Sequence, residues 1–130
     1  MSGLLLDTHI WLWHIGDDPR LPVSLSNEID TTPDDVWLSP TSIWEIGLLL
    51  ERGRLDLGFP LGDWFDRAIA RLPVRSADLT WEVAIVVNEL GMNTRDPADR
   101  FLAATAIVYD LTLLTTDRHM VAPGLRTRGV

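Results

Sequence analysis

The sequence has no cysteine, no lysine and no long apolar run. Without cysteine the chain can form neither disulfides nor thiolate metal sites, which fits a reducing compartment. No apolar run approaches the roughly 20 residues of a membrane-spanning helix, and no basic segment precedes the apolar residues 4–6. We therefore expect neither a membrane association nor a signal peptide, and we predict a cytoplasmic protein.

All eleven basic residues are arginine, and 19 acidic residues bring the formal net charge to −8. A negative net charge argues against a nucleic-acid partner. Bound metal ions would neutralise part of this charge, however, and arginine binds phosphate in a planar, bidentate way. Composition therefore leaves a nucleic-acid partner open.

With 130 residues, of which 46% are apolar, the chain is long enough for one domain with a single core. We expect this domain to span residues 1–130. Short segments at 3–6, 35–39 and 111–115 read as strands, and amphipathic helices separate them. This alternation predicts an α/β fold with a parallel sheet.

Cap signals place the helices between these strands. We expect five helices to begin at polar residues that are good N-caps: Thr8, Ser24, Ser39, Ser76 and Asp96. A further amphipathic helix is expected over 63–72, one helical turn over 118–121, and a last strand over 125–127.

Four acidic residues end, open or interrupt apolar segments: Asp7, Glu45, Asp99 and Asp117. Carboxylates are seldom buried unless they are paired or bind a metal ion. Asp7 and Asp117 also follow predicted strands, and parallel sheets bind ligands beyond the carboxyl ends of their strands. Mg²⁺ and Mn²⁺ bind through a few carboxylates and several waters, an arrangement suited to phosphodiester hydrolysis.

Each acid also has a simpler explanation when it is considered alone. Asp7 and Asp96 could cap the helices that follow them, and Glu45 could be a solvated helix residue. Asp99 could complement a helix dipole, and Asp117 could be a turn residue. A shared metal site explains them together, whereas the simpler explanations must hold separately.

Four motifs, in this order and spacing, closely resemble the PIN-domain family and, within it, the VapC-type toxins of bacterial toxin–antitoxin pairs. They are Leu4-Leu5-Leu6-Asp7-Thr8-His9, Ser42-Ile43-Trp44-Glu45-Ile46, Arg95-Asp96-Pro97-Ala98-Asp99-Arg100 and Leu114-Thr115-Thr116-Asp117. The resemblance covers nearly the whole chain. It implies a three-layer α/β/α fold with a short parallel central sheet, and the activity of a Mg²⁺- or Mn²⁺-dependent endoribonuclease.

The resemblance also implies roles for individual residues. Asp7 and Asp99 match acids that bind the metal directly, and Glu45 and Asp117 match acids that act through water or position the attacking water. The expected residues behind these ligands are the hydroxyl donors Thr8 and Thr116 and the capping acid Asp96. Three arginines flank the acids and either hold RNA phosphates or pair with the acids: Arg95, Arg100 and Arg118.

Toxins of this kind have an RNA substrate and are held inactive by a cognate antitoxin, here expected to be VapB-like or Phd-like. They form homodimers or larger toxin–antitoxin assemblies. Trp13 and Trp81 are candidates for a dimer or antitoxin surface, whereas Trp11, Trp44 and Trp64 fall on apolar helix faces that suit a core or a subunit interface.

Two other functions remain as alternatives. A phosphatase could use Asp7 as a covalent nucleophile. Such sites usually have a second acid two residues later, where this chain has His9, and often a lysine, which this chain lacks. A catalytically idle binding module is the other alternative, but it has no need to hold like charges together.

Overall fold

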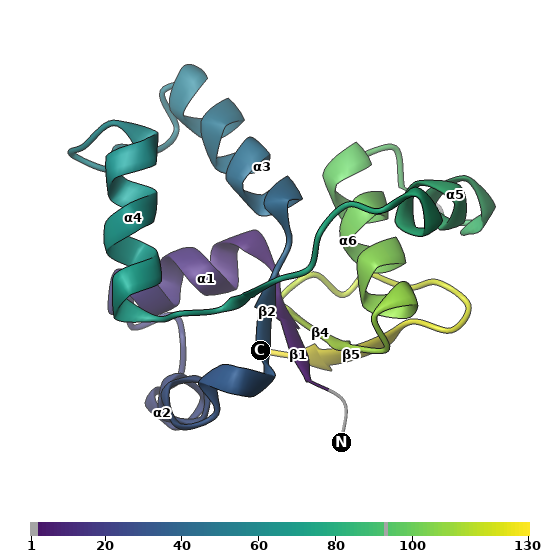
Figure 1. Ribbon diagram of the computed structural model, residues 1–130, viewed down its shortest axis with the longest axis horizontal. Coiled ribbons are helices and arrows are strands. Elements are labelled where there is room, and N and C mark those ends of the chain that lie inside the picture. Colours follow the sequence, from purple (N-terminus) through teal and green to yellow (C-terminus); the bar gives the residue numbers. More distant parts are fainter. Residues whose placement is uncertain (1–2, 93) are drawn as a thin grey trace.

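Five parallel strands form one sheet in the computed structural model, which describes residues 3–92 and 94–130 (Figure 1). Their order across the sheet is β3–β2–β1–β4–β5. The strands are β1 (Leu4–Leu6), β2 (Val36–Leu38), β3 (Arg75–Ser76), β4 (Thr112–Thr115) and β5 (Arg126–Gly129). The predicted parallel sheet is therefore confirmed, and the last strand begins one residue later than expected.

Helices cover both faces of this sheet. They are α1 (Thr8–Ile15), α2 (Val23–Thr31), α3 (Pro40–Glu51), α4 (Leu61–Arg71), α5 (Trp81–Glu89) and α6 (Pro97–Val108), with a short 3-10 helix, η1, over Pro33–Asp35. In Figure 1, α5 and α6 lie on one side of the sheet, and α1, α3 and α4 lie on the other. The fold is the three-layer α/β/α arrangement that the resemblance implies.

Alternating strand residues divide the core into two halves. Leu5 and Leu113 are fully buried and pack with residues of α5 and α6. Leu6 and Leu114 are also fully buried, but they pack with residues of α1 to α4 on the other face. Burying each such side chain contributes about 1.5–3 kcal/mol. Because both faces are covered, the central strands read as continuous apolar runs.

Two helix caps occur as predicted and position the starts of α3 and α6. The Ser39 hydroxyl accepts a hydrogen bond of 3.0 Å from the Thr41 amide, with Pro40 as the first helical residue. An Asp96 carboxylate oxygen accepts one of 3.0 Å from the Ala98 amide. These caps satisfy backbone amides that the first turn of a helix leaves without partners.

The predicted start of α5 at Ser76 is wrong. Ser76 lies in β3, opposite Leu38 of β2, so its backbone belongs to the sheet. The helix begins after Thr80, whose hydroxyl accepts a hydrogen bond of 3.2 Å from the Val83 amide. A serine and a threonine four residues apart are both acceptable caps, and pairing with β2 selects between them.

Other predicted boundaries differ in detail. Asp7, and not Thr8, caps α1, because its carboxylate accepts from the Thr8 amide. Helices α2 and α4 begin directly after Pro22 and Pro60, a residue or two before the expected starts at 24 and 63. Proline has the backbone angle φ of a helix, so a helix can follow it without a side-chain cap. The helical turn expected over 118–121 is absent, because residues 118–119 form a turn and residues 120–121 belong to no regular element.

Candidate functional site

The carboxyl edge of the sheet, at which β1, β2 and β4 end, holds the four acids singled out in the sequence. Asp7 directly follows β1, and Asp117 follows β4 after one intervening residue. Glu45 lies in α3, which leaves β2, and Asp99 lies in the first turn of α6. Helices α3 and α6 contact each other. Four segments distant in sequence thus meet in one place.

Asp7 is held at three points. Its amide donates to the Leu114 carbonyl at 3.0 Å, which continues the pairing of β1 with β4. One carboxylate oxygen accepts from the Thr8 amide at 2.7 Å, and the other accepts from the Thr115 hydroxyl at 2.6 Å. The helix-cap explanation and the shared-site explanation for Asp7 are therefore compatible, because one carboxylate caps α1 and faces the other acids.

Thr8 connects Asp7 with Glu45. Its buried hydroxyl donates to Glu45 Oε1 at 2.5 Å and lies 2.9 Å from the buried Ser42 hydroxyl. Thr8 thus donates a hydrogen bond to one of the four acids, as a residue behind a ligand would. The bond fixes the position of one carboxylate oxygen of Glu45.

The hydroxyl that supports Asp117 belongs to Thr115, not to the expected Thr116. The buried Thr115 hydroxyl accepts from the Asp117 amide at 3.0 Å and donates to Asp7 at 2.6 Å. Thr116 is exposed. Successive strand side chains point to opposite faces, so only one of the two threonines can face Asp7.

The acids lie close enough to repel one another. Partial burial is the largest cause that raises the pKa of the half-buried Asp99, and together with repulsion it brings that pKa to about 7. The repelling acids, in decreasing order of effect, are Asp96, Asp7, Asp117 and Glu45. The structure therefore brings the predicted quartet together, with Asp96 as a fifth member that also caps α6.

Glu45 is in a similar environment. Burial is the main cause of its raised pKa, the charges of Asp7 and Asp96 raise it further, and the hydrogen bond from Thr8 and the nearby His9 oppose the rise. A carboxyl group with a raised pKa can exchange protons closer to neutral pH.

Among the described residues, no arginine forms an ion pair with any of the five acids. Asp117 has the only ion-pair contact found for them there, with His119 at 3.3 Å. Arg100 instead donates to the Val87 carbonyl at 3.1 Å, in the last turn of α5. Arg95 and Arg118 are exposed. The alternative in which these arginines neutralise the acids therefore does not hold for the described part of the chain.

No three Asp, Glu or His side chains in the described ranges already stand close enough to hold a metal ion. The four acids lie at the same edge of the sheet, but they come from four different segments of the chain. Their chemistry fits a hard divalent cation, because the available donors are carboxylate oxygens and, among the described residues, no arginine is paired with them.

Two hydroxyl residues that contact the site, Thr115 and Ser42, were not predicted as site residues, although their spacing from the acids indicates them. Thr115 lies two residues before Asp117, so the two occupy the same face of an extended segment. Ser42 lies three residues before Glu45, which places both on one side of α3.

The tryptophans divide between the core and the surface. Trp11 is fully buried and packs edge-on against Trp64, with ring centroids 5.2 Å apart, as predicted. Trp44 is 48% exposed and Trp81 is 90% exposed. Trp44 is therefore no core residue.

The family model of the PIN domain matches residues 4–124. The chain is 31% identical over 121 residues to Ribonuclease VapC22 from Mycobacterium tuberculosis (strain ATCC 25618 / H37Rv), covering 92% of this chain and 91% of that protein.

Two crystal structures contain chains of the same fold. One is DNA-bound VapBC from Salmonella typhimurium, with a TM-score of 0.72 at 21% identity over 99% of this chain and 98% of the matched chain. The other is VapBC2 from Rickettsia felis bound to a promoter DNA fragment, with a TM-score of 0.72 at 18% identity over 97% of each chain. The match to the family model shows that the chain belongs to the PIN-domain family, and the similarity to Ribonuclease VapC22 shows that it is of the VapC type.

Proposed function

We propose that this protein is an endoribonuclease that hydrolyses RNA phosphodiester bonds with Mg²⁺ or Mn²⁺, and that it is the toxin of a type II toxin–antitoxin pair. The observation that carries the proposal is the convergence of Asp7, Glu45, Asp99 and Asp117 at the carboxyl edge without a neutralising arginine in the described residues. Similarity to a protein named as a ribonuclease supports the reaction class.

Each acid has a role in this proposal. Asp7 and Asp99 hold the cation directly, and Glu45 and Asp117 hold it through water. When bound, the cation would lower the pKa of the attacking water and stabilise charge on the phosphate. The Thr8 hydroxyl holds the carboxylate of Glu45 in position, and we assign this carboxylate the role of orienting the attacking water and accepting its proton.

Partners and setting follow from the same similarities. We propose that a VapB-like or Phd-like antitoxin holds the chain inactive, since the solved relatives of this fold are VapBC and FitAB assemblies. We further propose that the chain acts in the cytoplasm as a homodimer or within a larger toxin–antitoxin assembly, and that residues 1–130 form one PIN domain. No helix in the described ranges is long and apolar enough to cross a membrane.

The proposal predicts metal-dependent cutting of RNA by the purified protein. Single-stranded RNA should be cleaved in the presence of Mg²⁺ or Mn²⁺, and excess chelator should stop cleavage because the acids then lack their cation. Thermal unfolding should also shift upward with either ion, since a ligand that binds only the folded state stabilises it. Intact RNA together with hydrolysis of a small phosphate ester would favour the phosphatase alternative instead. Neither activity would favour the idle binding module.

Thr115→Val should lower RNA cleavage by roughly 10- to 100-fold, the usual cost of losing a group that orients a metal ligand. Valine has nearly the same shape but cannot donate to Asp7 or accept from the Asp117 amide. Thr116→Val, at the exposed neighbouring position, is the matched control and should cleave like wild type. Equal rates for the two variants would contradict the role assigned to Thr115.

A further inference from the structure

A hollow of about 440 Å³ lies between α3 and the start of α6, beside the acids. The residues that matter for its chemistry are Trp44, Glu45, Leu48, Arg52, Asp96 and Pro97. We call it the Trp44 hollow. Because it includes Glu45 and Asp96, it is continuous with the candidate active site.

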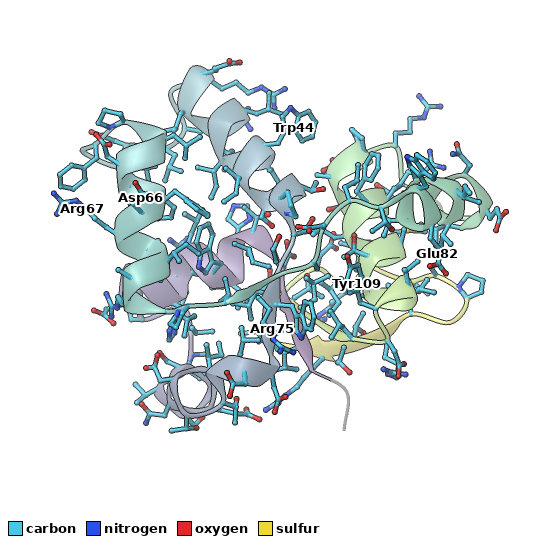
Figure 2. All side chains as sticks on the ribbon, in the orientation of Figure 1. Trp44, Asp66, Arg67, Arg75, Glu82 and Tyr109 are labelled. Atoms are coloured by element: carbon cyan, nitrogen blue, oxygen red, sulfur yellow. The ribbon has the colours of Figure 1, made fainter. Side chains whose placement is uncertain are left out.

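Trp44 gives this hollow an aromatic wall. It directly precedes Glu45 in α3, and 48% of its surface is exposed. Figure 2 shows its side chain on the side of α3 that faces α6. A large apolar ring left half exposed next to charged groups adds little to stability, because apolar side chains contribute mainly through burial. Such a ring does offer a flat surface on which another ring can stack.

Arg52 adds a positive charge to the same hollow. It is exposed, caps the end of α3 and forms no ion pair with the described residues. Eight residues separate it from Trp44, or about 12 Å along the helix axis. A base on Trp44 and a phosphate on Arg52 would therefore belong to neighbouring nucleotides.

We propose that the Trp44 hollow is a nucleoside-binding subsite for single-stranded RNA, in which a base stacks on Trp44 and the phosphate of a neighbouring nucleotide binds Arg52. Unpaired bases are commonly bound by stacking on aromatic side chains, and arginine binds phosphate through paired donors. The inference rests on the proposed ribonuclease function, because a phosphate can approach Glu45 and Asp96 only if a cation offsets their charge.

The second exposed tryptophan has different surroundings. Trp81 lies at the start of α5, which also carries the exposed Ile85, and the exposed Leu79 directly precedes the helix cap; none of the three lines the Trp44 hollow. Trp81 therefore provides a matched control for Trp44. Arg67, which is exposed on α4 and stacks on Phe59, provides one for Arg52.

The test measures RNA binding apart from cleavage. In an Asp7→Asn background, binding of a labelled single-stranded RNA is followed by fluorescence anisotropy in Mg²⁺. Trp44→Ala should raise Kd by roughly 5- to 100-fold, as loss of one stacked base does, whereas Trp44→Phe should keep most of the affinity. Arg52→Ala should lower the slope of log affinity against log salt by about 1. Trp81→Ala and Arg67→Ala should bind like the parent.

Two further measurements on Trp44→Ala complete the test: the kinetics of RNA cleavage, and the molar mass in solution, which reports the oligomeric state. With the catalytic acids intact, Trp44→Ala should raise KM for RNA more than it lowers kcat. If Trp44→Ala binds and cleaves like Trp81→Ala while wild type cuts RNA, the subsite is wrong and the proposed function stands. A change in molar mass with Trp44→Ala would instead assign Trp44 to an interface between copies and overturn the subsite. If wild type neither binds nor cuts RNA, both proposals fail.

Discussion

Asp99→Asn is expected to abolish RNA cleavage and, at the same time, to make the folded chain more stable near neutral pH. Asparagine keeps the shape of the side chain but removes the charge that we assign to direct cation binding. Loss of several kcal/mol of transition-state charge stabilisation corresponds to about 10³-fold or more in rate. The measurement is cleavage of single-stranded RNA at saturating Mg²⁺, with purified variant and wild type side by side.

The gain in stability follows from the raised pKa of Asp99. Its carboxyl group has an ordinary pKa of 3.8 and a pKa of about 7 in the folded chain. Between these pH values the folded state retains a proton that the unfolded state releases, so stability falls as pH rises through this window. Asp99→Asn removes this loss. Because the side chain is only half buried, solvent screening reduces the effect to on the order of 1 kcal/mol.

Thermal unfolding of both proteins from pH 4 to pH 8, in the presence of chelator, measures this effect. Wild type should lose stability relative to Asp99→Asn as pH rises. Glu45, whose pKa is raised by the same combination of burial and neighbouring charge, adds a pH dependence that both proteins share. Parallel stability curves for the two proteins would show that burial and the neighbouring acids do not raise the pKa of Asp99, and would contradict the environment assigned to it.

Asp7→Asn should also eliminate cleavage, by about 10³-fold or more for the same electrostatic reason, but with little change in fold stability. Asparagine is as good an N-cap as aspartate, so the bond from the Thr8 amide to the side chain can persist. The variant therefore separates the catalytic role of Asp7 from its structural role.

Asp7→Ala provides the contrast. It should be equally inactive but less stable by about 0.5–2 kcal/mol, because it removes the cap of α1. Chemical unfolding monitored by circular dichroism, together with the RNA cleavage assay, distinguishes the two substitutions. A cleavage rate for Asp7→Asn close to wild type would remove Asp7 from the catalytic set.

Much of the fold could be predicted because its main signals are local. Residues 4–6 and most of residues 111–115 are apolar, as is typical of a strand that is covered on both faces in a parallel sheet. Ser39 with Pro40, and Asp96 with Pro97, mark helix starts through the backbone chemistry of a first turn. The start of α5 was mistaken because Ser76 and Thr80 are both good caps, and pairing of β3 with β2 decides between them.

The acids of the candidate site could be predicted from the sequence, whereas the hydroxyl groups that hydrogen-bond to them were harder to predict. Asp7 and Asp117 are recognisable because each follows an apolar strand, where a charge is costly without a purpose. The hydroxyl of Thr115 that joins Asp7 to Asp117 depends on which face of β4 it occupies. Arg100 lies beside Asp99 in sequence, yet its guanidinium binds a carbonyl of α5.

The order of the residues along the chain was enough to specify alternating strands and helices, the main caps and the identity of the four acids. These features depend on periodicity and on the chemistry of neighbouring residues. Only the tertiary structure decided how the four acids are arranged. The packing of α3 against α6 and the pairing of β1 with β4 bring the acids close enough to repel one another and place Thr8 and Thr115 where they orient them. The same packing leaves Trp44 at the border of a hollow. Repulsion, orientation and exposure depend on distances between groups far apart in sequence, and those distances exist only once the layers have packed.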